Sequence, residues 1–498
     1  MRFRKQEGFM VMMKRIMVVF IMMAFLLPVK GQGYRIGVSF KGLSGDTLIL
    51  GEYFTTRMIP KDTVVLDSRG SGVFEGPERF RGGLYLIYLN PNYYFDFLID
   101  SLQVFSIATD TSDFVAKTVF QGSPDNDLFL EYKQLLRQSR TDAERYREEM
   151  ENAKNKKDSL NAREELKKLD HKVEQFYTGL NAQHPGLFVT DFIFATREPA
   201  VPDSILSGTP AENDSLRYFY IKNHYFDNFD FTDVRLLHTP LYENKIKTYI
   251  SRVVPQHPDS LKTAVDFLIE GSRSNGEIFR YMLITLFNHF AESKFMGMDA
   301  VYFHIAEKYY IPEATWSNPD FIRQLSQTLA ENKPTLVGQT APNLVMRRIP
   351  PEHFQMAVLD TAIKNDPHIG EDFLIHDIRT RFTILYFWEV DCGHCKRYTP
   401  ALHEAYQRLK DKSVEVLSVH VINSIEGKQK WVDYINENQM FDWINCWSPY
   451  SNEYRKIYNL KSFPQLFIFD KNKKIIAKKI TPEQAEEIIN TFDRLDLN

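Results

Sequence analysis

Short apolar runs separated by turn residues make up the chain from Tyr34 to about Gln121. Runs such as YRIGVSF, DTLILGEYF and GLYLIYL are rich in β-branched and aromatic residues, which favour strands. The break LNPN at residues 89–92 lies between two aromatic-rich runs and indicates a hairpin connection. We therefore predict an antiparallel β domain over residues 32–123.

The spacing of apolar residues changes after residue 123. In the segments 143–153 and 162–180 they recur at alternating steps of four and three, which is typical of amphipathic helices. The polar stretch KNKKDS between these segments indicates a turn, so an antiparallel helical hairpin with a solvated charged face is predicted. A coiled coil between two chains is the alternative, but the stretch is shorter than three or four heptads. Further helical segments extend the predicted helical region over residues 124–333.

Strand-like and helix-like segments alternate in the last third of the chain, after NKPTLVGQTAPNL at residues 332–344. The unbroken apolar run RFTILYFWEV is typical of a buried strand, and a helical stretch and a second strand, SVEVLSVHVI, follow it. PQLFIFD and KKIIAKKI predict a hairpin, and TPEQAEEIINTFDRL predicts a closing helix. This alternation predicts an α/β domain over residues 334–498. The fold class is thus multidomain, with an N-terminal antiparallel β domain, a mostly α centre and a C-terminal α/β domain.

The N-terminal residues 1–31 have the layout of a secretory signal peptide. Lys14 and Arg15 precede an apolar stretch at residues 16–29, and small residues follow. Because this stretch is too short to span a bilayer comfortably, a cleaved signal is favoured over a permanent anchor. The formal net charge is −4 and no basic block occurs, so no nucleic-acid partner is expected. We expect an exported, periplasmic protein.

The chemistry of the sequence centres on its cysteines, which all lie in the last quarter of the chain. They are Cys392, Cys395 and Cys446. A disulfide between the first two would close almost no loop and would stabilise the fold very little, so this pair needs a chemical explanation. Zinc would need two more ligands; Cys446, His403 and His420 are available, but no second closely spaced pair exists. A c-type haem needs a histidine directly after the second cysteine, where this chain has Lys396.

A redox role fits the position of the pair. Cys392 is predicted to lie between a buried strand and the first turn of a helix, with Cys395 one turn further in. Helix N-termini favour a thiolate over a thiol, so Cys392 is the expected nucleophile. Its thiolate would attack a partner disulfide, and Cys395 would resolve the mixed disulfide. A protonated His394 would stabilise the reduced form, and the reaction needs no metal or organic cofactor.

With these motifs the last third of the chain resembles the thioredoxin fold and, within it, the periplasmic thiol–disulfide oxidoreductases typified by TlpA and ResA. FWEVDCGHC matches the family's Phe-Trp-x-x-x-Cys-x-x-Cys, Pro400 matches the proline of the active-site helix, and SFPQLFIFD matches the loop with a cis-proline. The resemblance implies that Cys392 attacks, that Cys395 resolves, and that Pro464, preceded by Phe463, contacts the substrate. It also implies disulfide-containing exported proteins as substrates and a membrane-bound thiol electron donor.

Two departures from the family concern proton transfer. Thioredoxin has a buried Asp two residues before the Trp, where this chain has Tyr386, and related proteins commonly have a Glu where it has Tyr398. Glu389 is our candidate for assisting proton transfer to Cys395, the alternative being an exposed loop carboxylate without a role. Cys446, in the apolar run WINCW, is predicted to be a buried, inert thiol, with a redox role as the alternative.

The predicted function is therefore disulfide exchange with exported proteins, and the direction of electron flow is open. The Gly-His dipeptide between the cysteines is that of protein disulfide isomerase, whose potential is about −180 mV against about −270 mV for thioredoxin. The upstream β and helical portions resemble uncharacterised domains that precede such thioredoxin modules. The alternative function is a binding or assembly module in which those portions act and the thioredoxin-like domain is a docking unit.

Overall fold

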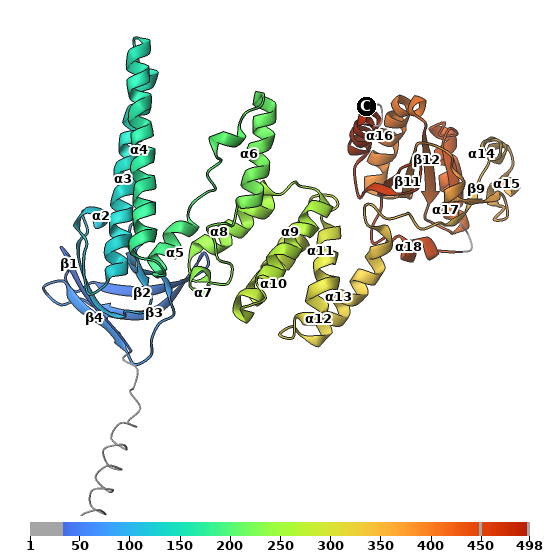
Figure 1. Cartoon of the computed structure of the whole chain (residues 1–498). Coiled ribbons are helices and arrows are strands. Elements are labelled where there is room, and N and C mark those ends of the chain that lie inside the picture. The colour runs from blue at the N-terminus through green and yellow to red at the C-terminus, as the bar shows by residue number, and fades with distance from the viewer. Residues whose placement is uncertain (1–32, 448–450, 496–498) are drawn as a thin grey trace, which may run out of the picture. The chain divides into compact units, whose positions relative to one another are not determined.

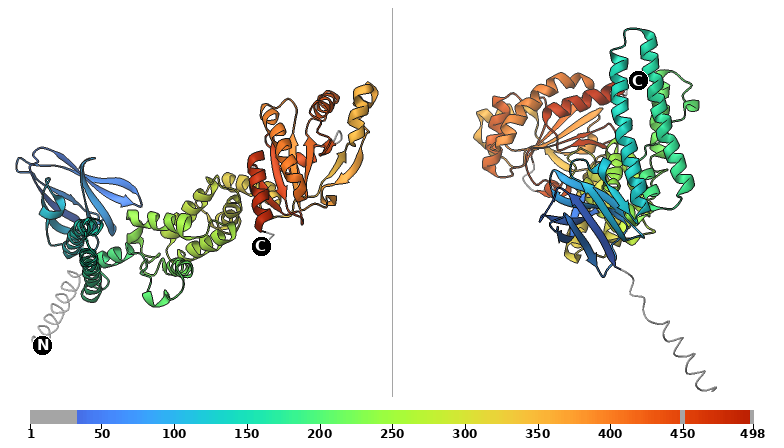
Figure 2. Two further views of the ribbon diagram at one scale, coloured as in Figure 1. Left: turned by 90° about the horizontal axis from the view of Figure 1, so that it is seen from above. Right: turned by 90° about the vertical axis from the view of Figure 1, so that its left-hand side faces the viewer.

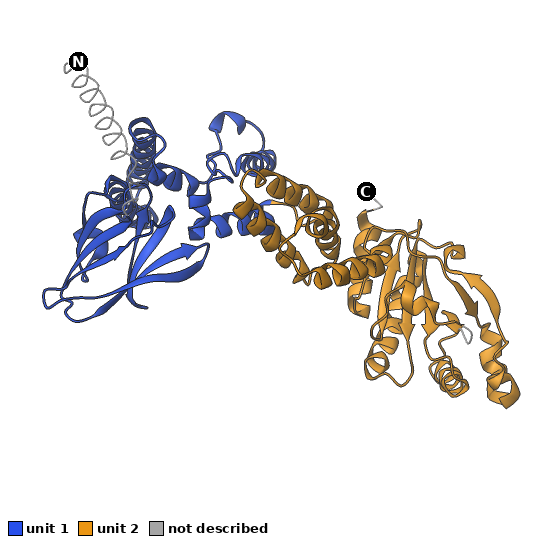
Figure 3. Cartoon of the chain, turned by 90° about the horizontal axis from the view of Figure 1, so that it is seen from below, with its two compact units in different colours: residues 1–253 blue, residues 254–498 orange. Residues whose placement is uncertain are grey.

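The computed structural model describes residues 33–447 and 451–495 (Figure 1). The predicted signal peptide, residues 1–31, lies outside the described residues. The chain divides into two compact units, residues 1–253 and 254–498 (Figure 3). This division falls inside the predicted helical region, and the domain boundaries drawn from the sequence stay predictions. No helix in the described part of the chain is long and apolar enough to cross a membrane.

The first unit begins with two four-stranded sheets that share one apolar core. The strands of one sheet, in order, are β4 (Ser71–Gly76), β1 (Tyr34–Lys41), β7 (Val104–Asp110) and β8 (Val119–Gln121). Those of the other are β3 (Arg57–Val65), β2 (Thr47–Phe54), β5 (Gly83–Asn90) and β6 (Tyr93–Ile99). The hairpin predicted at residues 89–92 joins β5 and β6. All pairs are antiparallel except β1 with β7, which run parallel.

Helices complete the first unit. They are α2 (Phe114–Lys117), α3 (Pro124–Glu151), α4 (Lys156–Gln183), α5 (Phe188–Ala195), α6 (Pro210–His224), α7 (Val234–Leu237) and α8 (Pro240–Thr248). The predicted helical hairpin is confirmed, because α3 and α4 lie side by side in each view (Figure 1, Figure 2). Its turn comes earlier than predicted. The Asn155 side chain accepts a hydrogen bond from the Asp158 N–H at 3.0 Å and so starts α4 at Lys156, inside the stretch KNKKDS.

The second unit opens with further helices, as the apolar spacing predicted. They are α9 (Pro258–Gly271), α10 (Gly276–Ala291), α11 (Asp299–Ile305), α12 (Ile311–Glu313) and α13 (Pro319–Asn332). Leu261, Val265, Met282 and Val301 are fully buried among them. Asp266 links α9 to the π-helical turn Ala306–Tyr310, since its carboxylate accepts a hydrogen bond from the Tyr309 hydroxyl at 2.8 Å. The central helical region predicted from the sequence is confirmed.

A seven-stranded mixed sheet forms the rest of the second unit. In order its strands are β10 (Glu371–Leu374), β9 (Val345–Arg348), β13 (Ile444–Trp447), β12 (Val414–His420), β11 (Phe382–Trp388), β14 (Gln465–Phe469) and β15 (Ile475–Lys478). The central strands β11, β12 and β13 are parallel, and the remaining pairs are antiparallel. The predicted α/β fold class is confirmed.

Both faces of this sheet are covered, and β11 is buried along its whole length. Its helices are α14 (Pro351–Leu359), α15 (Thr361–Asn365), α16 (Gly393–Leu409), α17 (Ile425–Glu437), α18 (Glu453–Ile457) and α19 (Pro482–Leu495). Because side chains alternate along a strand, Tyr386 and Trp388 face one apolar cluster, while Leu385 and Phe387 face the other. The first of these clusters also contains Cys395, so one face of β11 packs in the same core as this cysteine.

Candidate active site

The cysteine pair lies where β11 ends and α16 begins. Cys392 is the N-cap residue of α16, and its Sγ accepts a hydrogen bond from the Cys395 N–H at 3.4 Å. Pro400 lies inside the same helix. The first backbone N–H groups of a helix have no partner within the helix, and they favour a negatively charged group at this position. The local structure is therefore the strand, loop and helix start that the sequence predicts.

The two sulfurs differ in their access to solvent. Cys392 is half-buried, whereas Cys395 is only 1% exposed. Burial raises the pKa of the Cys395 thiol, and the neighbouring Cys392 sulfur raises it further. The sulfur of Cys392 is therefore open to a substrate disulfide, whereas the raised pKa keeps the buried Cys395 thiol protonated. His394, between the two cysteines, is exposed.

The loop before β14 lies next to Cys392, although it is about seventy residues further along the chain. The Phe463–Pro464 peptide bond is cis, as the resemblance implies. The Cys392 thiol donates a hydrogen bond to the Phe463 carbonyl oxygen at 3.5 Å. The structure thus brings together Cys392, Cys395 and the loop of Pro464.

A buried pair of hydroxyl groups lies on the inner side of α16. The Tyr386 hydroxyl and Thr399 Oγ1 are 2.9 Å apart, and both residues are fully buried. Thr399 is one helical turn beyond Cys395, and Tyr386 belongs to the same apolar cluster as Cys395. Burial raises the pKa of Tyr386. The sequence marked Tyr386 only as a departure from the family, and the spacing of four between Cys395 and Thr399 was the signal that could have found this pair.

Glu389 follows directly after β11 and is half-buried. Glu389 lies close to the Cys395 sulfur, because its backbone hydrogen bond lowers the pKa of Cys395 and its negative charge raises that pKa. Burial changes the pKa of Cys395 more than either of these effects. A cavity of about 200 Å³ adjoins it, and Asp391 and His420 also line this cavity. Asp391 forms an ion pair with Lys430 at 2.9 Å. Proton transfer through Glu389 stays a prediction.

The residues considered as further zinc ligands are buried or have other partners. His403 forms an ion pair with Asp442 at 3.0 Å, and His420 is 2% exposed and stacks on the Trp431 ring. Cys446 is fully buried within β13, and burial raises its pKa. In the part of the chain that the structure describes, no three His, Cys, Asp or Glu side chains lie together as a metal site. The burial of Cys446 agrees with the prediction of an inert thiol.

Comparisons with known families match two parts of the chain. A family described as Thioredoxin-like matches residues 380–475, which include β11, α16 and the loop of Pro464. A family described as a domain of unknown function (DUF5106) matches residues 141–323, upstream of it. The first match covers the whole constellation described above, and the second covers most of the helical region.

Relatives with assigned activities match the same C-terminal part. Sporulation thiol-disulfide oxidoreductase A of Bacillus subtilis is 30% identical over 119 residues, which are 24% of this chain and 70% of that protein. Thiol-disulfide oxidoreductase ResA of Oceanobacillus iheyensis is 25% identical over 167 residues, 32% of this chain and 74% of that protein. A thioredoxin-like protein from Bacteroides caccae, known as a crystal structure, is 19% identical with a TM-score of 0.39, covering 59% of this chain and 98% of that one. The chain belongs to the thioredoxin-like thiol–disulfide oxidoreductases, related to sporulation oxidoreductase A and ResA.

Proposed function

We propose that this oxidoreductase exchanges disulfides with exported proteins through its Cys-Gly-His-Cys centre, residues 392–395. One observation carries the proposal. The half-buried Cys392 sulfur lies between the Cys395 N–H and the Phe463 carbonyl oxygen, whereas the Cys395 sulfur is buried. This asymmetry suits a pair in which one thiol meets the substrate and the other acts afterwards.

The exchange consists of two balanced steps. The Cys392 thiolate attacks one sulfur of the client disulfide; the client S–S bond breaks, its second sulfur leaves as a thiolate, and a mixed disulfide forms. Cys395 then loses its proton and attacks the Cys392 sulfur, which releases the client's first sulfur and leaves a Cys392–Cys395 disulfide. Two electrons pass from the chain to the client, and the reverse sequence oxidises a dithiol client.

Neighbouring residues have defined roles in this proposal. Pro464 and Phe463 support an extended client strand beside Cys392, because the Phe463 carbonyl faces that sulfur. Glu389 lies near the Cys395 sulfur and accepts its proton in the second step. His394, exposed beside both cysteines, stabilises the reduced pair when it is protonated.

The proposed setting is the periplasm. The signal-peptide pattern of residues 1–31 supports export, and a disulfide-forming compartment supplies the client disulfides. A membrane-bound thiol donor would reduce the Cys392–Cys395 disulfide after each turnover. Reduction and reshuffling of client disulfides use the same two steps and differ in how often that donor is needed.

Trapping of the mixed disulfide tests the proposal. The mature chain carrying Cys395→Ser is incubated with a disulfide-bonded peptide, and its intact mass is measured before and after dithiothreitol. We expect an adduct of one peptide strand that dithiothreitol removes, no adduct with Cys392→Ser, and an unchanged adduct when Cys446→Ala is added. Equal adducts on Cys392→Ser and Cys395→Ser would contradict the proposal. Full cellular function of a Cys392→Ser chain would favour the binding-module alternative.

A further inference from the structure

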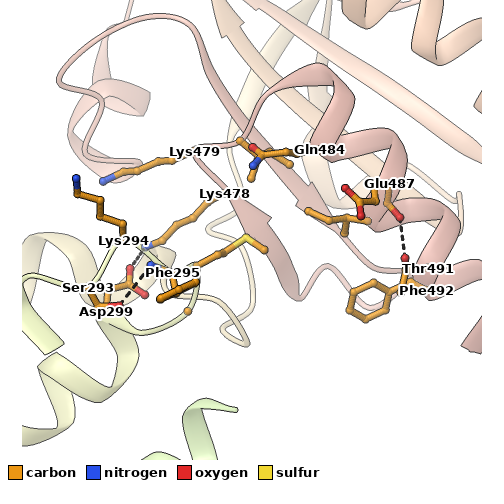
Figure 4. A pocket seen from close by; sticks show the side chains of 14 residues that line it. Ser293, Lys294, Phe295, Asp299, Lys478, Lys479, Gln484, Glu487, Thr491 and Phe492 are labelled. Atoms are coloured by element: carbon orange, nitrogen blue, oxygen red, sulfur yellow. Dashed lines mark hydrogen bonds and ion pairs between the residues drawn. The ribbon is translucent and has the colours of Figure 1, made fainter. Parts of the chain in front are cut away.

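A second feature of the same unit is a cavity of about 640 Å³ whose lining includes no cysteine (Figure 4). One wall is the loop between α10 and α11, residues 293–299, and the other is formed by the end of β15 and by α19. The cavity therefore lies between the thioredoxin-like sheet with its closing helix and the helical segment upstream of that sheet. Neither wall belongs to the site described above.

Exposed aromatic and methionine side chains line the cavity. Phe295 is 79% exposed, Met296 43% and Phe492 38%, and all three line it. Single exposed apolar side chains are normal on a protein, but a cluster of them at a concave site is typical of a binding surface. Ile480 and Ile488 extend the apolar lining.

The polar lining carries an excess of positive charge. Lys478 is buried and forms an ion pair with Asp299 at 2.6 Å, so these two charges offset each other. Lys294 and Lys479 are exposed and form no ion pair with any described residue, while Glu487 is the one further carboxylate of the lining. Three lysines against two carboxylates leave the lining with one net positive charge, in a chain whose formal net charge is −4. Such a site favours an anionic partner.

The backbone connects this cavity to the loop beside Cys392. The Lys479 N–H donates a hydrogen bond to the Leu466 carbonyl at 2.9 Å, and Leu466 follows Pro464 by two residues. Ile480, at the cavity wall, belongs to the same buried cluster as Cys395. The helices α16 and α19 also pack directly against each other. The loop of Pro464 and one wall of the cavity are therefore neighbouring parts of the same sheet edge and core.

We propose that the cavity binds the segment of a client polypeptide next to its disulfide, and that it selects an apolar side chain flanked by Asp or Glu. The inference rests on the proposed function, because it assumes that Cys392 attacks a client disulfide. Phe295, Met296 and Phe492 hold the apolar side chain, and Lys294 and Lys479 face the flanking carboxylates. The helical segment upstream thereby contributes to substrate choice.

A pair of matched substrates tests this proposal on the mature chain. Two disulfide-bonded peptides differ only in the residues beside the cysteine, Phe-Glu-Glu in one and Phe-Lys-Lys in the other, and bis(2-hydroxyethyl) disulfide is the small reference substrate. The variants are Phe295→Ala and Lys294→Glu, both on the exposed loop. Phe267→Ala is the control, since Phe267 is 50% exposed on α9 and does not line the cavity.

We expect kcat/KM of the unmodified chain to favour the acidic peptide about tenfold, and both loop variants to lose most of this preference. Phe267→Ala keeps the preference, and all chains exchange the small disulfide at the same rate. An equal preference in all four chains, with normal exchange of the small disulfide, overturns the cavity assignment alone. If the unmodified chain exchanges none of the three disulfides, the proposed function fails and this inference fails with it.

Discussion

Two regions of the thioredoxin-like part carry the same residue types in opposite surroundings. At the start of α16, Cys392 is half-buried and His394 is exposed. In the sheet interior, Cys446 on β13 is fully buried and His420 on the neighbouring strand β12 is 2% exposed. Burial raises the pKa of Cys446 and lowers the pKa of His420 to about 3. The same two residue types are therefore open to solvent at the start of α16 and shielded from it in the sheet interior.

The comparison also separates the two faces of α16. Cys392 at its N-cap is half-buried, whereas Cys395 and Thr399 are buried on its inner face. The active pair thus spans both environments, one sulfur in each. In the proposed exchange, this division lets Cys392 meet the substrate first and keeps Cys395 for the second step.

Removal of the Cys392 sulfur should have the largest effect on activity. With Cys392→Ser, we expect disulfide exchange to fall by more than about a thousandfold, because a serine hydroxyl does not replace a thiolate in this reaction. The rate of peptide disulfide reduction measures the effect, with Cys446→Ser as the matched control in the interior. Comparable losses from the two substitutions would show that the two regions do not differ as described.

Burial of His420 should make the free energy of unfolding depend on pH. Because burial lowers the folded-state pKa of His420 to about 3, the unfolded chain binds a proton below about pH 6.5 and the folded chain does not. The contribution to stability is complete above pH 6.5 and decreases as the pH falls towards 3. At pH 5 the expected loss is about 2 kcal/mol relative to pH 7.5.

Urea unfolding of the chain and of His420→Phe at both pH values isolates this contribution. Other groups titrate equally in the two proteins, and Asp391, whose charge acts on His420, is present in both. The variant should lose about 2 kcal/mol less than the parent between pH 7.5 and pH 5. An identical loss in both proteins would argue that His420 titrates as an exposed residue does.

The inner face of α16 can be tested through its hydroxyl pair. Tyr386→Phe leaves the buried Thr399 hydroxyl without its partner, and we expect the free energy of unfolding to fall by about 1–2 kcal/mol. Thr399→Val in addition removes the unpaired group and should recover most of that loss, since replacing both partners of a buried hydrogen bond is nearly neutral. Strictly additive losses in the double variant would show that the two hydroxyls do not interact.

The smallest effect is expected for the interior cysteine. Cys446→Ala removes the thiol group from a fully buried position, which costs about 1 kcal/mol of unfolding free energy. The rate of disulfide exchange should stay within about twofold, because the residue lies outside the constellation of Cys392, Cys395 and Pro464. A marked slowing at unchanged stability would give Cys446 the redox role that its burial argues against.

Much of the site could be predicted because its signals are local. The apolar run before Cys392 and the helical spacing after Cys395 define a strand, a loop and a helix within about thirty residues. The loop of Pro464 lies far along the chain, and only the resemblance to a known family connected it with the cysteines. Burial of the two sulfurs depends on the whole sheet, so no local pattern of residues predicts it.

The features that the sequence did not predict depend on contacts between segments that are far apart in the chain. The strands β9 and β10 have four residues each, too few for an alternating pattern to stand out, and they pair with each other and with β13. The parallel pairing of β1 with β7 joins segments about seventy residues apart, so no local sequence pattern predicts it. The cavity beside Phe295 likewise needs a loop and a helix that are about two hundred residues apart in sequence.

The central claim is that Cys392 and Cys395 form a reversible redox pair while Cys446 does not take part. The direct measurement is equilibration of the mature chain in glutathione buffers of graded potential, followed by alkylation and peptide mass analysis. We predict one two-electron transition in which a Cys392–Cys395 disulfide forms, with Cys446 alkylated only after unfolding. The midpoint also decides between a reductase, near about −270 mV, and an isomerase, near about −180 mV. No disulfide at any potential, or a disulfide that includes Cys446, would contradict the account.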